Sequence, residues 1–343
     1  MKKFFAVIGN PPYQDESSGE QKNFAPPIYN SFMDEAYKVA EKVTLVTPAR
    51  FLFNAGSTPK KWNEKMLADK HLKVLKYVAD GSTIFPNTDI KGGVAVTHRD
   101  ESKDYGAIGT FTAFEELNGI LKKMNALNVQ SLMDEIFIQI RFDLDVLLKK
   151  YPKTKKNIGS EGKDSRLEKN IFTKVSEVFS ENKCRDDDVK VLGIIDNKRN
   201  WRFVPKNLID LNHPNLSKFK VLVPTSNGSG AFGETFSTPV VGEPFVGYTR
   251  SFIGIGKFDT KKQAEACLKY VKTKFLRAML GVLKITQDNN RDSWKYVPLQ
   301  DFTSKSNIDW TKSVHEIDLQ LYKKYGLSKE EKDFIETHVK EMV

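Results

Sequence analysis

The feature that most constrains this chain is a short apolar segment that two consecutive prolines bring to an end. The run Phe4–Ile8 is typical of a buried strand, and Gly9 and then Asn10-Pro11-Pro12-Tyr13 follow it directly. Because proline has no backbone N–H and a fixed φ, two prolines in a row continue neither a helix nor a sheet ladder. The sequence therefore predicts a strand and then a rigid, extended turn with Asn10 and Tyr13 at its two ends.

This turn suits a flat ring that carries an exocyclic amine. The side-chain oxygen of Asn10 and the backbone carbonyl of Pro11 can each accept a hydrogen bond from the amine. With both N–H bonds engaged, the nitrogen can lose its conjugation with the ring and become a nucleophile. The ring of Tyr13 can stack on the face of the base. The alternative is a Pro-Pro turn that merely ends a strand.

Asn-Pro-Pro-Tyr after a hydrophobic strand resembles the catalytic motif of DNA methyltransferases that methylate an exocyclic amine, chiefly adenine N6. Pro48–Leu52, Asp89–Val94 and Leu321–Val343 further resemble the adenine methylases of type II restriction–modification systems, some of which fuse nuclease and methylase. The resemblance touches both ends of the chain and matches the middle loosely. It implies that Asn10, Pro11, Pro12 and Tyr13 are catalytic, that S-adenosylmethionine is the cofactor and that double-stranded DNA is the substrate.

Strand and helix patterns alternate over residues 1–105. Helical spacing is predicted at Ile28–Ala40 and Trp62–Leu72, and strands at Val43–Pro48, Lys73–Val78 and Gly92–His98. This βαβ order predicts a parallel sheet, and it resembles the second half of the methyltransferase fold, after its catalytic motif. In that resemblance Phe85 matches an aromatic residue that packs against a flipped base, and its alternative is a core phenylalanine. The polar segment 14–25 is predicted to be a mobile loop over the site.

Beyond residue 105 the pattern changes to short strands between Gly-, Asn- and Ser-rich turns, which is typical of a target-recognition domain. Helices are predicted at Phe114–Met124, Asp134–Tyr151, Gln263–Leu283 and Lys329–Val343, a lysine-rich loop at Pro152–Asn170, and strands at Val189–Ile195, Trp201–Val204, Phe219–Val223, Pro239–Val241 and Phe245–Tyr248. We therefore predict an α/β chain. A partial Rossmann-like methyltransferase sheet occupies residues 1–105, an α+β DNA target-recognition domain 106–310, and a C-terminal helical segment 311–343.

Several basic stretches of this second part are candidate DNA contacts. The residues are Lys198, Arg199, Asn200, Trp201 and Arg202, then Tyr248 and Arg250, and the loop Gln287–Arg291. Arginines that read guanine edges or grip phosphate, with amides and aromatic rings between them, suit a recognition surface. The lysine-rich loop 152–170 is a candidate for following the DNA backbone. The alternative for each stretch is an ordinary basic surface loop.

The composition restricts the remaining classes of function. A net charge of +10 is compatible with nucleic-acid binding without being diagnostic of it. No apolar run approaches the roughly 20 residues of a membrane span, so no membrane association is predicted. Two cysteines are too few for a disulfide framework or a cysteine zinc site, and a cytoplasmic location is predicted. The five histidines lack metal-ligand spacing, so no metal site is predicted.

The cofactor pocket is expected to be mostly absent from this chain. In related families with this domain order, a glycine-rich turn and an acidic residue that bind S-adenosylmethionine precede the Asn-Pro-Pro-Tyr strand, whereas nine residues precede Asn10 here. Phe252–Gly256 matches a Phe-x-Gly-x-Gly pattern, which leaves a circularly permuted enzyme as an alternative. A tight turn that enters the following helix is the interpretation that we favour for this stretch.

Without that half, one edge of the Phe4–Ile8 strand would be bare and open to pairing. A second chain, the recognition domain or a longer polypeptide would cover it, unless the chain is a fragment of reduced stability; we expect a partner chain or a longer polypeptide. The predicted function is site-specific DNA adenine-N6 methylation in a restriction–modification system, by an enzyme that is incomplete or partner-dependent. The alternatives are a DNA-binding specificity component that is inactive alone, and the methylase and recognition part of a fused restriction endonuclease.

Overall fold

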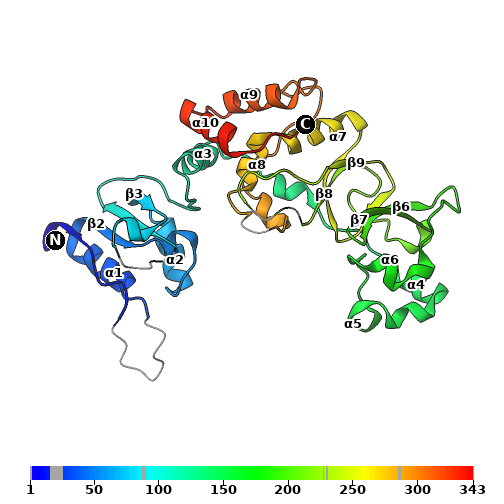
Figure 1. Cartoon of the computed structure of the whole chain (residues 1–343), viewed down its shortest axis with the longest axis horizontal. Helices are drawn as coiled ribbons and strands as arrows, with labels where there is room; N and C mark the ends of the chain where they lie inside the picture. The colour runs from blue at the N-terminus through cyan, green and yellow to red at the C-terminus, as the bar shows by residue number, and fades with distance from the viewer. Residues whose placement is uncertain are drawn as a thin grey trace. The chain divides into compact units, whose positions relative to one another are not determined.

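The computed structural model describes residues 2–15, 26–86, 90, 92–226, 228, 231–284 and 287–342. The chain forms two compact units, Met1–Asn118 and Gly119–Val343 (Figure 1). Sequence analysis placed the first boundary near residue 105 and set residues 311–343 apart, whereas the structure includes the latter in the second unit. Residues 16–25 of the predicted loop over the site, and Asp89 and Lys91, lie outside the described residues.

The first unit is built on a four-stranded sheet of order β1-β2-β4-β3. Its strands are β1 (Phe4–Gly9), β2 (Ala40–Pro48), β3 (Leu72–Val78) and β4 (Val94–Asp100). β1 pairs with β2 in parallel, and β4 runs antiparallel between β2 and β3. The strands β1, β2 and β3 therefore run in one direction, and their carboxyl ends lie at the same edge of the sheet.

Helices α1 (Tyr29–Val39) and α2 (Lys60–Ala68) cover this sheet on the side of its core. Met33 and Met66 from the helices pack with Val43 and Leu45 of β2, and all four are buried. The indole Nε1–H of Trp62 donates a 3.0 Å hydrogen bond to Asp34 Oδ2 and so ties α2 to α1. The predicted helix 62–72 is too long, because Leu72 is the buried first residue of β3.

The outer strand β1 differs from its prediction as a buried strand. Among the described residues it has one neighbouring strand, β2, and Phe4, Phe5 and Ile8 remain 50%, 68% and 82% exposed. Val7 alone among its large side chains packs against the core of the unit. A continuous apolar run is typical of a strand that is covered on both faces. An outer strand with exposed apolar side chains is a site where another chain or segment can add a strand.

The second unit contains two sheets. The first has the order β10-β6-β7, with β6 (Val189–Ile195), β7 (Lys198–Val204) and β10 (Val246–Tyr248). Its core also includes buried residues of α4 (Leu144–Lys150) and α6 (Ile171–Lys174), and Figure 1 shows these helices beside β6 and β7. The second sheet has the order β5-β11-β8-β9, with β5 (Ile136–Phe137), β8 (Phe219–Pro224), β9 (Val240–Gly242) and β11 (Phe252–Phe258).

The remaining α-helices belong to the second unit, except that α3 begins four residues before the first residue of that unit. They are α3 (Glu115–Ala126), α5 (Gly159–Gly162), α7 (Lys261–Lys272), α8 (Lys274–Leu280), α9 (Val314–Lys324) and α10 (Lys329–His338). The chain is thus a mixed α/β protein with several sheets. No helix in the described part of the chain is long and apolar enough to cross a membrane.

Two helix predictions and one loop prediction in this unit are wrong in length or kind. The predicted helix 134–151 is a 3₁₀ turn, the short strand β5 and a helix that begins only after Asp143, whose carboxylate accepts the backbone N–H of Val146. The predicted helix 263–283 is divided at Thr273, which is extended and caps α8 through its hydroxyl. The predicted loop 152–170 contains a 3₁₀ helix, Pro152–Lys156, and the short helix α5.

Candidate functional site

Three segments with polar and aromatic side chains meet the carboxyl edge of the first sheet. Asn10–Tyr13 follows β1, Ala49–Phe53 follows β2, and Asp80–Phe85 follows β3. The backbone N–H of Ala49 donates to Gly93 O at 2.9 Å, which fixes the second segment to the start of β4. Ligands of open α/β sheets bind at the carboxyl ends of strands, so this edge is the candidate site of the first unit.

The turn Asn10–Tyr13 leaves its first residue open to a ligand. Asn10 and Pro12 are exposed, whereas Pro11 and Tyr13 are half-buried. The carbonyl of Tyr13 accepts the backbone N–H of Ile28 at 3.2 Å, which ties the end of the turn to the start of α1. The structure therefore holds the turn at one end and exposes the Asn10 side chain at the other.

The structure brings together the two aromatic residues that the sequence assigned to the site. The ring centroids of Tyr13 and Phe85 lie 6.3 Å apart with an interplanar angle of 82°, an edge-to-face contact. The backbone N–H of Phe85 donates to Gly81 O at 2.9 Å, so its ring is held by the turn after β3. Perpendicular rings in contact do not leave a parallel slot between them, so a flat base would stack on one ring or separate the two.

The hydroxyl of Tyr13 is an unusual group in this site. Its Oη is buried and has no hydrogen-bond partner among the described residues. Burial raises the pKa of this phenol above its ordinary value. Tyr13 therefore acts in this arrangement as an aromatic surface and not as a source of charge.

Arg50 also lies at this edge, although it was not among the site residues predicted from the sequence. It lies two residues after the end of β2, and its aliphatic chain packs over Gly56 and Gly92, both of which have positive φ. A Cβ added to Gly92 would lie 2.7 Å from Arg50 Cγ, so the glycine makes room for this side chain. The signal that could have found Arg50 is a basic residue shortly after a buried strand that is parallel to β1.

The candidate DNA contacts on β7 do not form one surface. Antiparallel pairing with β6 sets Arg199 and Trp201 opposite Ile194 and Leu192, and sets Arg202 opposite Val191. Because side chains alternate along a strand, Arg199 and Trp201 share one face, whereas Lys198, Asn200 and Arg202 share the other.

Both arginines of β7 have partners within the protein. Arg202 pairs with Glu181 at 2.9 Å, and Arg199 Nη2 donates to Ser237 O at 2.7 Å.

The prediction that Tyr248 contacts DNA is wrong for this structure. Its side chain is fully buried in the second unit, and its hydroxyl donates to Asn215 Oδ1 at 3.2 Å. An aromatic ring at the end of a short strand is as typical of a core as of a recognition loop. Arg250, in contrast, is 53% exposed and pairs with Glu168 at 3.1 Å.

The third candidate DNA loop, Gln287–Arg291, is anchored to the protein. Asn289 is fully buried, and its Nδ2 donates to Pro224 O at 3.1 Å. Arg291 Nε donates to Met133 O at 3.0 Å. These two side chains hold the loop in place, which the polar composition of the stretch did not reveal.

Neither interpretation of the glycine pattern Phe252–Gly256 is right. The five residues lie inside β11, which is paired with β5 on one side and with β8 on the other. A Cβ at Gly254 would collide with Tyr248 Oη, and one at Gly256 would collide with the Phe258 ring. These glycines therefore allow close packing within a buried sheet and do not form a cofactor turn after a strand.

The described part of the chain contains no group of three or more His, Cys, Asp or Glu residues that could hold a metal ion.

A mixed α/β unit with its polar and aromatic residues at the carboxyl edge has the arrangement of a ligand-binding α/β domain. Residues 1–85, which include the Asn10–Tyr13 turn and Phe85, match the family model of the Eco57I restriction-modification methylase. An uncharacterized adenine-specific methylase of Mycoplasma pneumoniae is 32% identical over 96 residues, which span 27% of this chain and 23% of that protein. The first quarter of the chain is thus similar to restriction–modification methylases.

Two solved structures of restriction enzymes align with most of the chain at low similarity. The type IIG restriction endonuclease BpuSI aligns with a TM-score of 0.34 and 9% identity over 97% of this chain and 54% of that one. The type IIL restriction-modification enzyme MmeI, solved in complex with DNA, aligns with a TM-score of 0.33 and 8% identity over 97% of this chain and 56% of that one. The chain spans about half the length of these two proteins.

Proposed function

We propose that this chain is the catalytic and recognition part of a DNA methyltransferase that modifies adenine N6 in a restriction–modification system. The observation that carries the proposal is the position of the Asn10–Tyr13 turn, at the carboxyl edge of a sheet and in contact with Phe85. The match of residues 1–85 to a restriction–modification methylase supports it, because that segment contains the whole candidate site.

In the proposed reaction the chain binds an adenine that has left the DNA duplex. Asn10 Oδ1 and the carbonyl of Pro11 accept hydrogen bonds from the two N–H groups of the exocyclic amine. The rings of Tyr13 and Phe85 provide aromatic surface for the base, which offsets the few kcal/mol that flipping costs. This scheme requires no side chain as a general base.

S-adenosylmethionine, the cofactor that methylases use, would supply the methyl group. The turn Asn10–Tyr13 fits the side of such a site that holds the base. The glycine pattern Phe252–Gly256 forms no adenosyl pocket, because it lies within the inner strand β11. The chain's own contribution is to hold and orient the amine of the base.

The free edge of β1 is the place where we propose that a cofactor-binding segment completes this sheet. Phe4 and Ile8 share one face of β1 and are exposed there, and the outer edge of β1 pairs with no strand in the described part of the chain. β1 is already parallel to β2, and a further parallel strand with its helix would cover both the edge and that face. Such a segment would belong to a second chain or to a longer polypeptide.

The experiment that tests the proposal compares methyl incorporation with DNA binding in variants of the turn. Asn10→Ala is expected to lower incorporation by about 10²–10³-fold, on the scale of one lost transition-state hydrogen bond. Tyr13→Ala is expected to lower it through lost stacking, which contributes about 1–3 kcal/mol per base. Both variants should leave duplex binding in a gel shift largely unchanged. The cofactor-binding partner is supplied from the same restriction–modification locus. Asn125→Ala, at an exposed position of α3, is the matched control and should retain full incorporation.

Wild-type incorporation by both turn variants would contradict the assignment of the site. DNA binding by the wild-type protein without any incorporation, even with the partner present, would instead favour a specificity component that has no activity of its own.

A further inference from the structure

The positive charge of the chain is concentrated in one segment of the second unit. Residues 149–174 contain nine Lys and Arg and three Asp and Glu, a net charge of +6 within a chain whose total is +10. All eight lysines of the segment are exposed: Lys149, Lys150, Lys153, Lys155, Lys156, Lys163, Lys169 and Lys174. We call these eight side chains the lysine face.

Arginines neutralise two of the three acidic groups of this region, Asp164 and Glu168, which leaves Glu161 as the acidic residue that offsets eight lysines. Arg166 forms two hydrogen bonds of 2.8 Å to the carboxylate of Asp164. Glu168 pairs with Arg250 at 3.1 Å and with Arg166 at 3.4 Å. Within the part of the chain that the structure describes, no lysine of the lysine face has a carboxylate within ion-pair distance. The field outside this surface is therefore positive.

A packed core holds the lysine face in a fixed arrangement. Ile158, Leu167, Ile171 and Phe172 alternate with the lysines along the segment and are buried in the core that includes β6 and β7. Thr154 is also buried, and its hydroxyl donates to Tyr151 O at 2.7 Å. The segment is thus a folded surface with its apolar side chains inside and its ammonium groups outside, and not a flexible basic tail.

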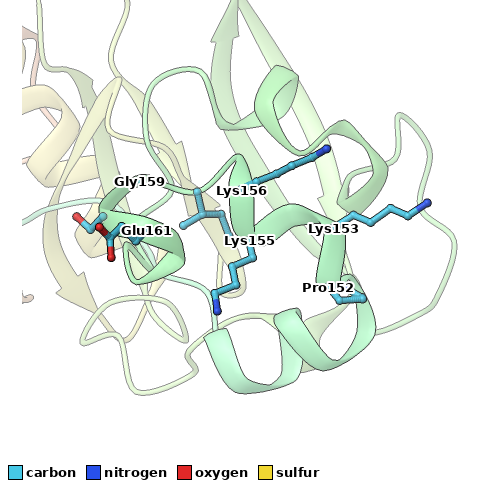
Figure 2. Close-up of a pocket in the computed structure, with 8 residues that line it drawn as sticks. Pro152, Lys153, Lys155, Lys156, Gly159 and Glu161 are labelled. Atoms are coloured by element: carbon cyan, nitrogen blue, oxygen red, sulfur yellow. The ribbon is translucent and has the colours of Figure 1, made fainter.

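A hollow of about 530 Å³ lies at one end of the lysine face. Its lining includes Lys153, Lys155, Lys156 and Ser160, and Figure 2 shows the three lysine side chains extending from the turn Pro152–Lys156 in different directions. Ammonium groups that diverge along a surface suit a row of separate charges better than one small anion. The different directions of these three side chains therefore favour a polyanion over a free phosphate (Figure 2).

The other side chains of the segment restrict the kind of polyanion. No large apolar side chain of residues 149–174 is exposed, whereas a membrane-bound surface would need such anchors. Its aromatic residues are also covered: Phe172 is buried, and Tyr151 is half-buried with Lys150 Nζ 5.5 Å from its ring centroid. Single-stranded nucleic acids are bound by exposed aromatic rings on which bases stack. A duplex, which offers phosphates and no free base faces, fits the surface best.

We infer that the lysine face binds the phosphate backbone of double-stranded DNA without reading its sequence. This inference rests on the proposed function, since it assigns the surface by which such an enzyme would hold its substrate. Contacts of lysine ammonium groups with phosphate release counterions from the duplex, so they contribute affinity that falls steeply with salt. They position the protein on the DNA, and base contacts elsewhere would set the sequence.

The test removes charge from the lysine face and, as a control, from another surface. The full chain carries Lys153→Gln, Lys155→Gln and Lys156→Gln, and the matched control carries Lys262→Gln, Lys305→Gln and Lys323→Gln at exposed positions. Binding to a short mixed-sequence DNA duplex is measured by fluorescence anisotropy over a range of salt concentrations. Three lost phosphate contacts lower the slope of log K against log salt by about 2.7 and weaken binding by about tenfold or more at low salt.

The outcomes separate this inference from the proposed function, because binding and methyl incorporation are measured independently. A loss of slope and affinity confined to the lysine-face variant, with its circular dichroism unchanged, supports the inference even if the enzyme is inactive. An equal loss in the control variant overturns it, because net charge alone would then explain binding. Competition by poly-glutamate as effective as that by duplex DNA also overturns it, since any polyanion would then suffice.

Discussion

Tyr13 and Phe85 follow the two outer strands of the first sheet, β1 and β3, and their rings nevertheless meet edge to face at 6.3 Å. The segments after these strands must therefore converge at the carboxyl edge, over the ends of β2 and β4. A contact of this kind closes one side of the candidate site with aromatic surface, beside the exposed Asn10 side chain. It also makes the hydroxyl of Tyr13 a measurable feature, because that group is buried without a partner among the described residues.

We expect Tyr13→Phe to raise the free energy of unfolding by about 1 kcal/mol, because it removes a buried hydroxyl that makes no hydrogen bond. Chemical denaturation of the isolated chain measures the change. Tyr77→Phe is the matched control, since the Tyr77 hydroxyl donates to Gly92 O at 3.4 Å and its removal should bring no gain. A clear loss of stability in Tyr13→Phe would mean that the hydroxyl has a partner.

The exposed edge of β1 gives a second prediction. Ile8→Lys should change the unfolding free energy by less than about 0.5 kcal/mol, because the side chain is 82% exposed, and it should reduce association at this edge. Analytical ultracentrifugation with and without the cofactor-binding partner measures the association. Val7→Lys is the contrast on the same strand, since Val7 packs against the core and a charge there should destabilise the unit. Unchanged association in Ile8→Lys would contradict the proposed docking edge.

The sequence predicted the elements of the candidate site better than their environment. An apolar run that ends in two prolines specifies a strand and a turn, and the alternation of strand and helix patterns up to β4 predicted the strands of the first sheet. The burial of β1 was predicted wrongly, because burial depends on which strands lie beside it and the sequence of one strand does not contain that information. The assignment of Phe85 to the site with Tyr13 came from a resemblance and not from spacing, since no local pattern links residues that follow two outer strands. The prediction placed a base between the two rings, whereas the structure has them in direct contact.

In the second unit, too, the sequence did not distinguish side chains that are buried in the core from side chains that are exposed on the surface. Tyr248 and Arg250 are close in sequence and were assigned together to DNA binding, yet the first is buried and the second is exposed. The glycines of Phe252–Gly256 match a cofactor pattern, yet they lie in an inner strand that Tyr248 packs against. Such distinctions depend on tertiary packing, which a short motif does not specify.

Arg250 is the exposed arginine for which we predict a role in DNA binding. Arg250→Ala should weaken binding by about 1–3 kcal/mol if the side chain reads a base edge, and mainly at one base pair of the target. A contact with phosphate would instead weaken all duplexes alike and lower the salt slope by about 0.9. Anisotropy titrations with duplexes that differ at single positions distinguish the two. No change in affinity for any duplex would exclude Arg250 from the interface.

Tyr248→Phe tests whether the Tyr248 side chain belongs to the core of the second unit and not to a DNA-binding surface. The buried hydroxyl donates to Asn215 at 3.2 Å, so its removal should lower the unfolding free energy by about 1 kcal/mol. Because the side chain is not on the surface, the folded variant should bind duplex DNA with unchanged affinity. A variant of full stability and reduced DNA affinity would return Tyr248 to the recognition surface.

The last prediction concerns the pH dependence of stability, through a carboxylate buried between α8 and α9. The carboxylate of Asp318 on α9 accepts hydrogen bonds from the backbone N–H groups of Lys274 and Phe275 at 3.0 and 2.8 Å. These two hydrogen bonds cap the start of α8. Burial raises the pKa of Asp318 to about 6, although these two hydrogen bonds and Arg277 oppose the shift and Glu336 adds to it. The folded chain therefore holds this proton more tightly than the unfolded chain does.

The contribution of Asp318 to stability is thus fully present below about pH 4 and is lost as the pH rises to about 6. Relative to Asp318→Asn, which does not titrate, the wild-type protein should lose about 2–3 kcal/mol of unfolding free energy across that range. Denaturant melts of both proteins at intervals of pH measure the difference, and Asp145→Asn at an exposed position of α4 is the control. A difference that grows in favour of the wild type as the pH rises would show that the two backbone hydrogen bonds outweigh burial, and that Asp318 caps α8 as a carboxylate.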